Sequence, residues 1–181
     1  MKIDLFSAPI RKYAISNNQP HVDYWDNEYK QERFDQISPV IMAYPNVPNP
    51  LYQNYSDIMD QFMDEIGASD THSWIFQTYI LKALEKGEST DRMDTLPSHY
   101  TLTHYISDCK KSDMYWHPIH QIIRTFDPSV NEWTDTSGVY VNQGDVIIHP
   151  SWIESNSPMN ENSDLRMTLS IPVVIKKNEQ S

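Results

Sequence analysis

The side chains with the greatest capacity for chemistry lie in the C-terminal half of this 181-residue chain. His117 and His120 stand three residues apart, and His149 follows further along. Imidazole nitrogens bind iron and zinc, so these three could meet around a metal with Asp113 or Glu154 as the carboxylate. Histidines of strands are also common as half-buried hydrogen-bonding residues, and this second interpretation stays open.

A guanidinium and a hydroxyl stand two residues apart in the last predicted strand. Every second residue of that strand is apolar: Met167, Leu169, Ile171, Val173 and Ile175. This period of two predicts one apolar face, with Arg166 and Thr168 on the opposite face. A planar guanidinium offers two parallel donors to a carboxylate, so Arg166 is a candidate anion-binding residue. The alternative is an ion pair with Asp164 or Glu161 at the strand entrance.

Other catalytic chemistries have weaker support in the sequence. Cys109 lies beside two lysines, which favours its thiolate, but no glycine-rich nucleophile turn surrounds it. No Gly-x-Ser-x-Gly motif occurs, and four glycines in the whole chain are too few for a phosphate-binding glycine-rich loop. Asp60 and Asp64 share one face of a predicted helix, where a solvated acidic surface explains them better than glycosidase chemistry.

The charge balance excludes two classes of partner. The chain has 14 basic and 25 acidic residues, a formal net charge of −11. A nucleic-acid or anionic-membrane surface needs a basic stripe, and the sequence contains none. The sequence also shows no signal-peptide pattern and no apolar run near the roughly 20 residues that span a bilayer. We therefore expect a soluble protein that is cytoplasmic or destined for a large assembly, and that is not secreted by a signal peptide.

The predicted elements that must position these residues fall into two parts. Residues 1–55 are rich in prolines and aromatic residues, which predicts an extended N-terminal arm, and residues 56–181 are predicted to form the folded domain. Ile58, Phe62 and Ile66 predict a helix over 57–66 that ends at Gly67. Residues 73–86 suit a strand in the first half and a helix end in the second. Short strands are predicted at 99–107, 121–126, 138–141, 145–149 and 166–175. Helical material followed by strands indicates an α+β fold with a sandwich or barrel.

One segment resembles a known family. The residues from Gly144 to Ile153, with Gly144-Asp145 at the start and Pro150-Ser151-Trp152 near the end, precede Asn160 and the segment from Arg166 to Pro172. This pattern resembles the iron(II)/2-oxoglutarate-dependent oxygenases, in the prolyl-hydroxylase-like branch common in phages and marine bacteria. The opening Leu5–Pro9 segment is similar to the start of many members. The match covers about residues 144–173, with a vaguer one back to about residue 99.

The resemblance implies a double-stranded β-helix, or jelly roll, with one or two packing helices. In such a barrel Arg166, helped by Thr168, would hold the distal carboxylate of 2-oxoglutarate. The iron of this family needs two histidines and one carboxylate, and the position of the second histidine falls on Ser155. The first pair matches the segment His117–His120, where the spacing leaves Ile119 or Pro118 in place of a ligand. The resemblance therefore implies a degenerate metal site.

Three hypotheses follow for the function. The leading one is a catalytically degenerate oxygenase-like domain without a cofactor, acting as a structural or interaction protein. Its expected partners are other protein chains, bound through residues 1–55, and its setting is a phage virion, in the neck, tail or baseplate. The alternative is an active iron(II)/2-oxoglutarate-dependent hydroxylase with displaced ligands, using His117 or His120 with His149. A third is a cupin-like binder of a small anion through Arg166.

Overall fold

The computed structural model describes residues 10–32, 40–90, 97–109, 114–116 and 137–178. These residues form two helices and ten strands. The helices are α1 (Gln19–Glu32) and α2 (Asn49–Glu65). The strands are β1 (Arg11–Ala14), β2 (Val40–Tyr44), β3 (His72–Phe76), β4 (Tyr79–Leu84), β5 (Tyr100–Tyr105), β6 (Met114–Trp116), β7 (Ser137–Gly138), β8 (Asp145–Pro150), β9 (Glu154–Asn156) and β10 (Arg166–Lys177).

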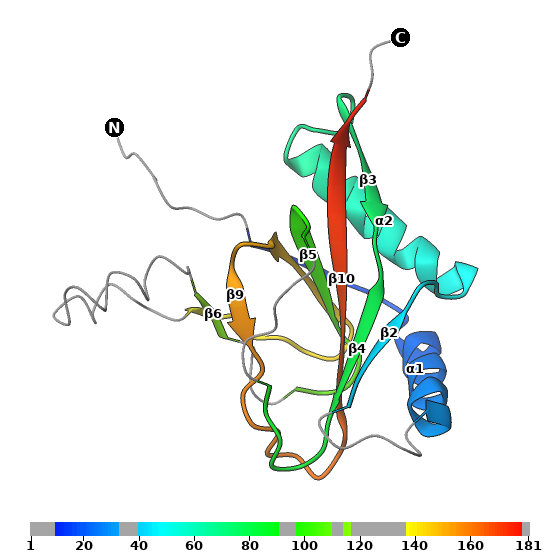
Figure 1. Ribbon diagram of the computed structural model, residues 1–181, viewed down its shortest axis with the longest axis vertical. Helices are drawn as coiled ribbons and strands as arrows, with labels where there is room; N and C mark the ends of the chain where they lie inside the picture. The colour runs from blue at the N-terminus through cyan, green and yellow to red at the C-terminus, as the bar shows by residue number, and fades with distance from the viewer. Residues whose placement is uncertain (1–9, 33–39, 91–96, 110–113, 117–136, 179–181) are drawn as a thin grey trace, which may run out of the picture.

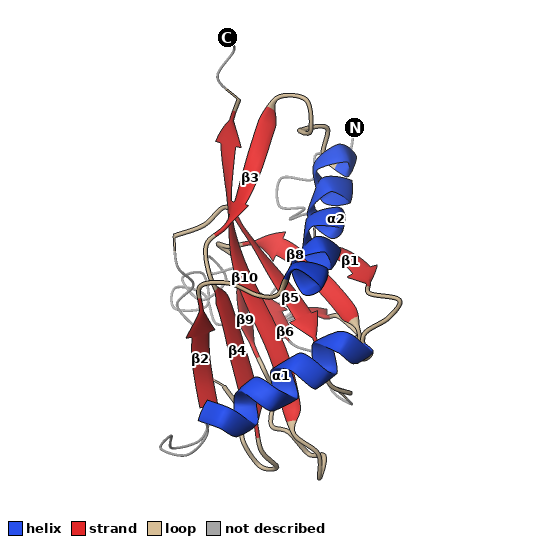
Figure 2. Ribbon diagram, turned by 90° about the vertical axis from the view of Figure 1, so that its right-hand side faces the viewer, coloured by secondary structure: helices blue, strands red, loops and turns tan. Residues whose placement is uncertain are grey.

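The strands form two antiparallel sheets. The large sheet has the order β1-β8-β5-β10-β4-β2, with β3 pairing with β10, and the small sheet has the order β7-β6-β9. An isolated bridge joins Thr90 to Ser157, the residue directly after β9. The helices cover one face of the large sheet, and β6 and β9 lie on the other side (Figures 1 and 2). This is the α+β jelly roll that the sequence predicted; the strand predicted at 121–126 lies outside the described residues.

The apolar face of β10 forms the centre of the main hydrophobic core. Leu169 and Ile171 are fully buried, and α2 packs Tyr55, Met59 and Phe62 into the same cluster. Burying a leucine or isoleucine side chain stabilises a fold by roughly 1.5–3 kcal/mol. The predicted alternation in this strand is therefore confirmed, and its apolar face lies under the helices.

Helix α2 is longer than the sequence predicted. The expected start at residue 57 was wrong, because the helix begins at Asn49, directly after Pro48. Pro50 lies in the first turn, where a missing backbone N–H breaks no intrahelical hydrogen bond, so a proline taken as a breaker is in fact compatible with the start. The predicted end is confirmed, since Gly67 follows the helix with a φ of 69°. Neither described helix combines the length and apolar character needed to cross a membrane.

The ambiguous segment 73–86 consists of two strands and no helix. β3 pairs with the C-terminal end of β10, and the two project as a ribbon from the rest of the sheet (Figure 2). β4 pairs with β10 on one side and with β2 on the other. Alanine, leucine and lysine in the second half favour a helix locally, but pairing on both edges decides the structure.

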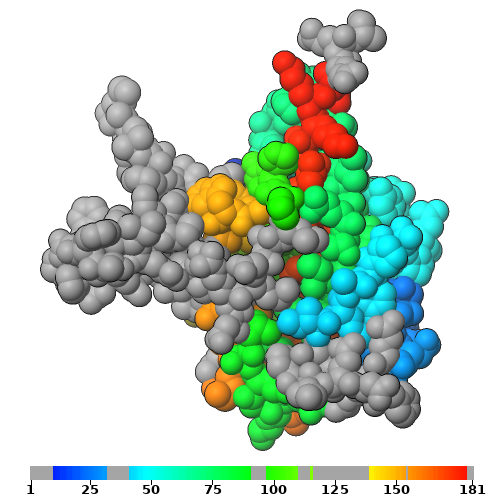
Figure 3. All heavy atoms as spheres, in the orientation of Figure 1, coloured from blue at the N-terminus to red at the C-terminus, as the bar shows by residue number. Residues whose placement is uncertain are grey.

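The described part of the expected N-terminal arm, residues 10–32 and 40–55, is folded into the domain, which corrects the prediction. β1 and β2 belong to the large sheet, α1 packs on it, and the boundary expected after residue 55 falls inside α2. The segment with β2 and α2 (cyan) lies directly against the segment with β3 and β4 (green) in Figure 3. His21, Trp25 and Tyr29 recur every four residues and are all buried, so the aromatic residues mark one helix face.

Candidate functional site

The face of the large sheet that points away from the helices is polar and buried. Directly paired residues of neighbouring strands share a face of the sheet. Thr168 of β10 pairs with Lys82 of β4 on one side and with Tyr105 of β5 on the other, and Ser170 pairs with Thr103. All five residues are buried. The barrel side of the sheet therefore carries hydroxyls and a cation beside apolar side chains such as Ile147, which pairs with Thr103 and belongs to a second hydrophobic cluster.

Arg166 adds a second buried cation to this face. It precedes Met167, which faces the helices, so it lies on the barrel side, and only 2% of it is exposed. Its Nη1 donates a hydrogen bond of 3.2 Å to the carbonyl of Pro158, in the segment that follows β9. Arg166 pairs with Leu84, two residues from Lys82 on the same strand. Arg166 and Lys82 therefore lie near each other on one buried face.

His149 lies on the same side of the sheet, where it pairs with Thr101. It is 1% exposed, and its Nδ1 lies 2.9 Å from the carbonyl oxygen of Pro150. Because a carbonyl only accepts, Nδ1 carries the proton in this contact. The ring packs edge-on against Tyr115, with 5.1 Å between centroids, and Tyr115 shares a 2.9 Å hydrogen bond with Tyr105. His149 is thus built into the barrel wall.

Ser155 lies on β9, where it pairs with Tyr115 of β6. Its hydroxyl is neutral and is a poor ligand for iron(II), which prefers imidazole and carboxylate. Beyond β6 come His117 and His120, which lie outside the described residues, as does Asp113. Within the described ranges no three histidine, cysteine, aspartate or glutamate residues gather into a possible metal site. Because the candidates for the other ligand positions lie outside the described residues, the degenerate metal site stays a prediction.

Lys82 and the Tyr105–Tyr115 pair are residues of this site that the sequence analysis missed. The signal for Lys82 was present, because it is the one charged residue in the otherwise apolar stretch from Tyr79 to Leu84. Its significance depends on the pairing with Thr168, 86 positions later, which a local pattern does not show. The tyrosines meet for the same reason, since neighbouring strands bring them together.

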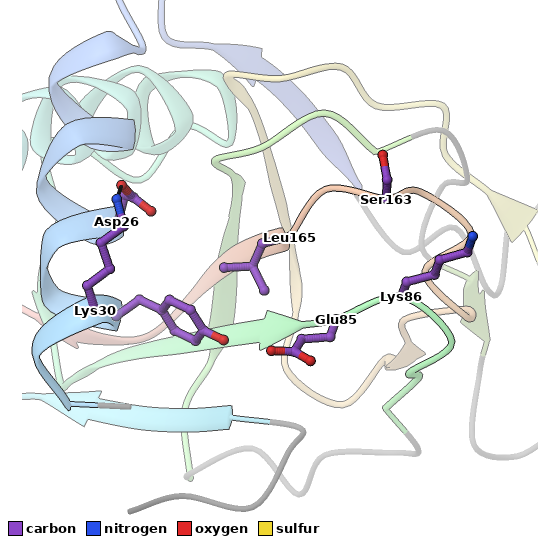
Figure 4. A pocket seen from close by; sticks show the side chains of 7 residues that line it. Asp26, Lys30, Glu85, Lys86, Ser163 and Leu165 are labelled. Carbon is purple, nitrogen blue, oxygen red and sulfur yellow. Dashed lines mark hydrogen bonds and ion pairs between the residues drawn. The ribbon is translucent and has the colours of Figure 1, made fainter. Parts of the chain in front are cut away.

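A separate pocket of about 760 Å³ opens on the helix side of the sheet (Figure 4). It is lined by Asp26, Tyr29, Lys30, Glu85, Lys86, Ser163 and Leu165. Lys30 pairs with Asp26 one turn earlier on α1. Charges of both signs, several of them exposed, give this pocket no preference for an anion or a cation. The candidate functional site is therefore the barrel side of the large sheet.

Comparisons with known proteins support the fold assignment alone. No family model matches the sequence, and no curated protein matches it. Solved structures match at low identity over most of the chain. AviO1 from Streptomyces viridochromogenes Tue57 is 12% identical, with a TM-score of 0.60 over 92% of this chain and 90% of that one.

Two prolyl hydroxylases are similar in the same way. The Pseudomonas putida prolyl-4-hydroxylase is 12% identical, with a TM-score of 0.58 over 94% of this chain and 95% of that one. The viral collagen prolyl hydroxylase of Paramecium bursaria Chlorella virus-1, solved with 2-oxoglutarate, is 10% identical, with a TM-score of 0.57 over 91% of this chain and 94% of that one. The chain has the jelly-roll fold of the iron(II)/2-oxoglutarate oxygenases, as the resemblance implied.

Proposed function

We propose that this chain is an oxygenase-fold protein that has lost its iron chemistry and acts through contacts with other proteins. The observation that carries the proposal is Ser155, which puts a neutral hydroxyl on β9 where the resembling family has its second histidine. A ligand set reduced in this way binds iron(II) weakly, because each imidazole contributes a large share of the affinity. The barrel then remains as a scaffold.

The two outer strands of the large sheet support a role in protein contacts. β1 and β2 stand at opposite ends of the strand order, and both come from residues 1–55. Among the described residues, β2 pairs with β4 alone, and its Ile41 is 43% exposed. An edge strand with an exposed apolar residue is suited to pairing with another chain. We therefore place the partner surface in residues 1–55 and propose a phage neck, tail or baseplate as the setting.

Anaerobic titration with iron(II) and 2-oxoglutarate tests the loss of iron chemistry. An intact site gives a visible metal-to-ligand charge-transfer band when both are bound. We expect no saturable band for the full chain at stoichiometric iron. A band that saturates at one iron per chain would overturn the proposal and establish the working hydroxylase.

The variant Ser155→His sharpens the same experiment. Restoring an imidazole on β9 should raise iron(II) affinity at least tenfold, about 1.4 kcal/mol, because the position regains a good ligand. Ser163→His adds an imidazole at an exposed position and serves as the matched control. Equal iron affinity in the two variants would show that Ser155 does not occupy a ligand position.

Sedimentation of the native chain tests the structural role. In cells that produce the encoding phage, the chain should sediment with intact particles, and Ile41→Lys should reduce the bound fraction severalfold. Gln61→Lys, an equally exposed change on α2, should leave it unchanged. A chain that stays in the supernatant as a monomer contradicts the structural role.

A second candidate function is favoured by the cationic barrel side. Arg166 and Lys82 are both buried there beside Thr168, an arrangement suited to a dicarboxylate such as 2-oxoglutarate. A working hydroxylase would convert 2-oxoglutarate to succinate and carbon dioxide as oxygen is consumed. Succinate formed with iron present and abolished in Arg166→Met would select this second function over the first.

A further inference from the structure

Five polar side chains form a continuous hydrogen-bonded chain beneath the helices. Asn54 Nδ2 lies 2.9 Å from His21 Nε2, and His21 Nδ1 lies 3.0 Å from the Tyr55 hydroxyl. The same hydroxyl lies 3.0 Å from His104 Nδ1, and His104 Nε2 lies 2.8 Å from Asn18 Oδ1. Both histidines and the tyrosine are fully buried. None of these contacts involves the barrel face.

A backbone carbonyl fixes the orientation of the Asn18 amide at one end of this hydrogen-bonded network. Asn18 Nδ2 donates to the carbonyl oxygen of Ile106 at 2.9 Å, so Asn18 Oδ1 is the atom that faces His104. An amide oxygen only accepts, and therefore His104 Nε2 carries a proton. A neutral His104 then has an acceptor at Nδ1, to which the Tyr55 hydroxyl donates.

The donor and acceptor roles in the remaining hydrogen bonds follow from this assignment. Since the single proton of the Tyr55 hydroxyl goes to His104, the hydroxyl must accept from His21 Nδ1. A neutral His21 then accepts at Nε2 from the Asn54 amide. Every donor meets an acceptor, and the two histidines are opposite tautomers. An added proton on His104 Nδ1 would remove the acceptor of the Tyr55 hydroxyl proton, and an added proton on His21 Nε2 would face the Asn54 amide donor.

This hydrogen-bonded network connects three elements that are distant in sequence. His21 belongs to α1, Asn54 and Tyr55 to α2, and His104 to β5, while Asn18 lies just before α1. The groups packed on the imidazoles are the Tyr55 phenol, the two amides and the other imidazole, with 4.9 Å between the ring centroids. Tyr79 is the next titratable group, 6.3 Å from the Tyr55 ring. No carboxylate is among these neighbours in the described residues.

Burial opposes protonation of both rings. It lowers the pKa of His21 to about 4, and burial, followed by the nearby His21, holds the pKa of His104 well below its usual range. The unfolded chain exposes both rings, with a usual pKa of about 6.5. Unfolding between these values takes up protons. The native state is thus favoured above about pH 6.5 and loses stability as the pH falls towards 4.

We propose that the chain from Asn54 through His21, Tyr55 and His104 to Asn18 is a latch that holds α1 and α2 on the sheet only while both histidines are neutral. Acidification opens the latch and releases the helix layer. The barrel face takes no part, so the latch is independent of any ligand chemistry there.

The pH dependence of unfolding of the full chain tests the latch. Two protons taken up on unfolding change the unfolding equilibrium constant up to about 100-fold per pH unit between pH 6 and 5, and a single proton changes it tenfold. Denaturant unfolding should show the steep dependence in the native sequence and a tenfold dependence in His21→Gln. His72→Gln, which removes a histidine outside the latch, should keep the steep dependence. An unchanged slope in His21→Gln would overturn the proposal.

Two further measurements remain informative where a variant does not fold. Nitrogen-15 NMR of the native chain at pH 7.5 should report the Nδ1–H tautomer for His21 and the Nε2–H tautomer for His104. Amide hydrogen exchange at pH 5, corrected for its intrinsic pH dependence, should accelerate in α1 and α2 before β5 and β10. The reverse tautomers, or exchange that accelerates equally in all four elements, would contradict the latch.

Discussion

The two faces of the large sheet differ in the kinds of side chain that they bury. On the helix side, Leu169 and Ile171 pack with residues of α2, and five polar side chains form a hydrogen-bonded network around Tyr55. On the barrel side, the same strand presents Arg166, Thr168 and Ser170 with Lys82 beside them. Both faces are buried and each has an apolar cluster, but the barrel side also holds two buried cations.

Burying a cation costs several kcal/mol unless partners compensate, and apolar replacements of similar volume often stabilise a protein. A protein that needed only a stable sheet would gain from apolar residues on both faces. The buried cations of the barrel side are therefore costly unless partners compensate them, whereas the helix side supplies the main hydrophobic core.

The largest expected effect comes from placing a charge on the helix side. Leu169→Asp buries a carboxylate among apolar side chains and should destabilise the fold by about 4 kcal/mol or more, enough to unfold it. Leu169→Met preserves the volume and should cost less than about 1.5 kcal/mol. Circular dichroism during thermal melting measures both. A folded aspartate variant would show that this face is not the core.

A smaller loss is expected from the polar chain of the same face. Tyr55→Phe removes the hydroxyl that connects His21 and His104, which leaves two buried ring nitrogens without their partner. We expect a loss of about 2–4 kcal/mol in the free energy of unfolding, measured with urea. Tyr52→Phe changes a partly exposed ring and should lie within about 0.5 kcal/mol of the native chain. Equal losses in the two variants would mean that the buried Tyr55 hydroxyl contributes no more to stability than the partly exposed Tyr52 hydroxyl.

The smallest change in stability is expected on the barrel side. Arg166→Met keeps the volume of the side chain and should alter the free energy of unfolding by less than about 1 kcal/mol. Millimolar 2-oxoglutarate should raise the melting temperature of the native chain but not that of the Arg166→Met variant. Arg11→Met, at an exposed position, should retain that rise. A loss above about 3 kcal/mol in Arg166→Met would instead make the guanidinium a structural residue.

The sequence predicted those parts of the fold whose signal is local. The alternation from Arg166 to Ile175 and the glycine after α2 depend on neighbouring residues, and both predictions are confirmed. β2 and β4 were missed because their pairing with distant strands decides their structure, whereas the strand expected in the first half of 73–86 is present as β3. The N-terminal region was misread because prolines at the ends of elements were taken as evidence of an extended chain.

The same distinction holds for the candidate site. Arg166 and Thr168 could be proposed from one strand, since two residues two positions apart share a face. Lys82 and Tyr105 reach the same face through pairing with Thr168, which only the assembled sheet shows. The buried histidines His21 and His104 gave no sequence signal at all, because their contact joins α1 to β5.

Anomalous diffraction from crystals of the full chain, grown without oxygen and soaked with manganese(II) and 2-oxoglutarate, tests the central claim most directly. Manganese(II) takes the place of iron(II) in such sites and gives its own anomalous signal. We predict no anomalous peak inside the barrel near Ser155, whether or not 2-oxoglutarate lies beside Arg166. A peak held there by three protein side chains would contradict the account and identify a working metal centre.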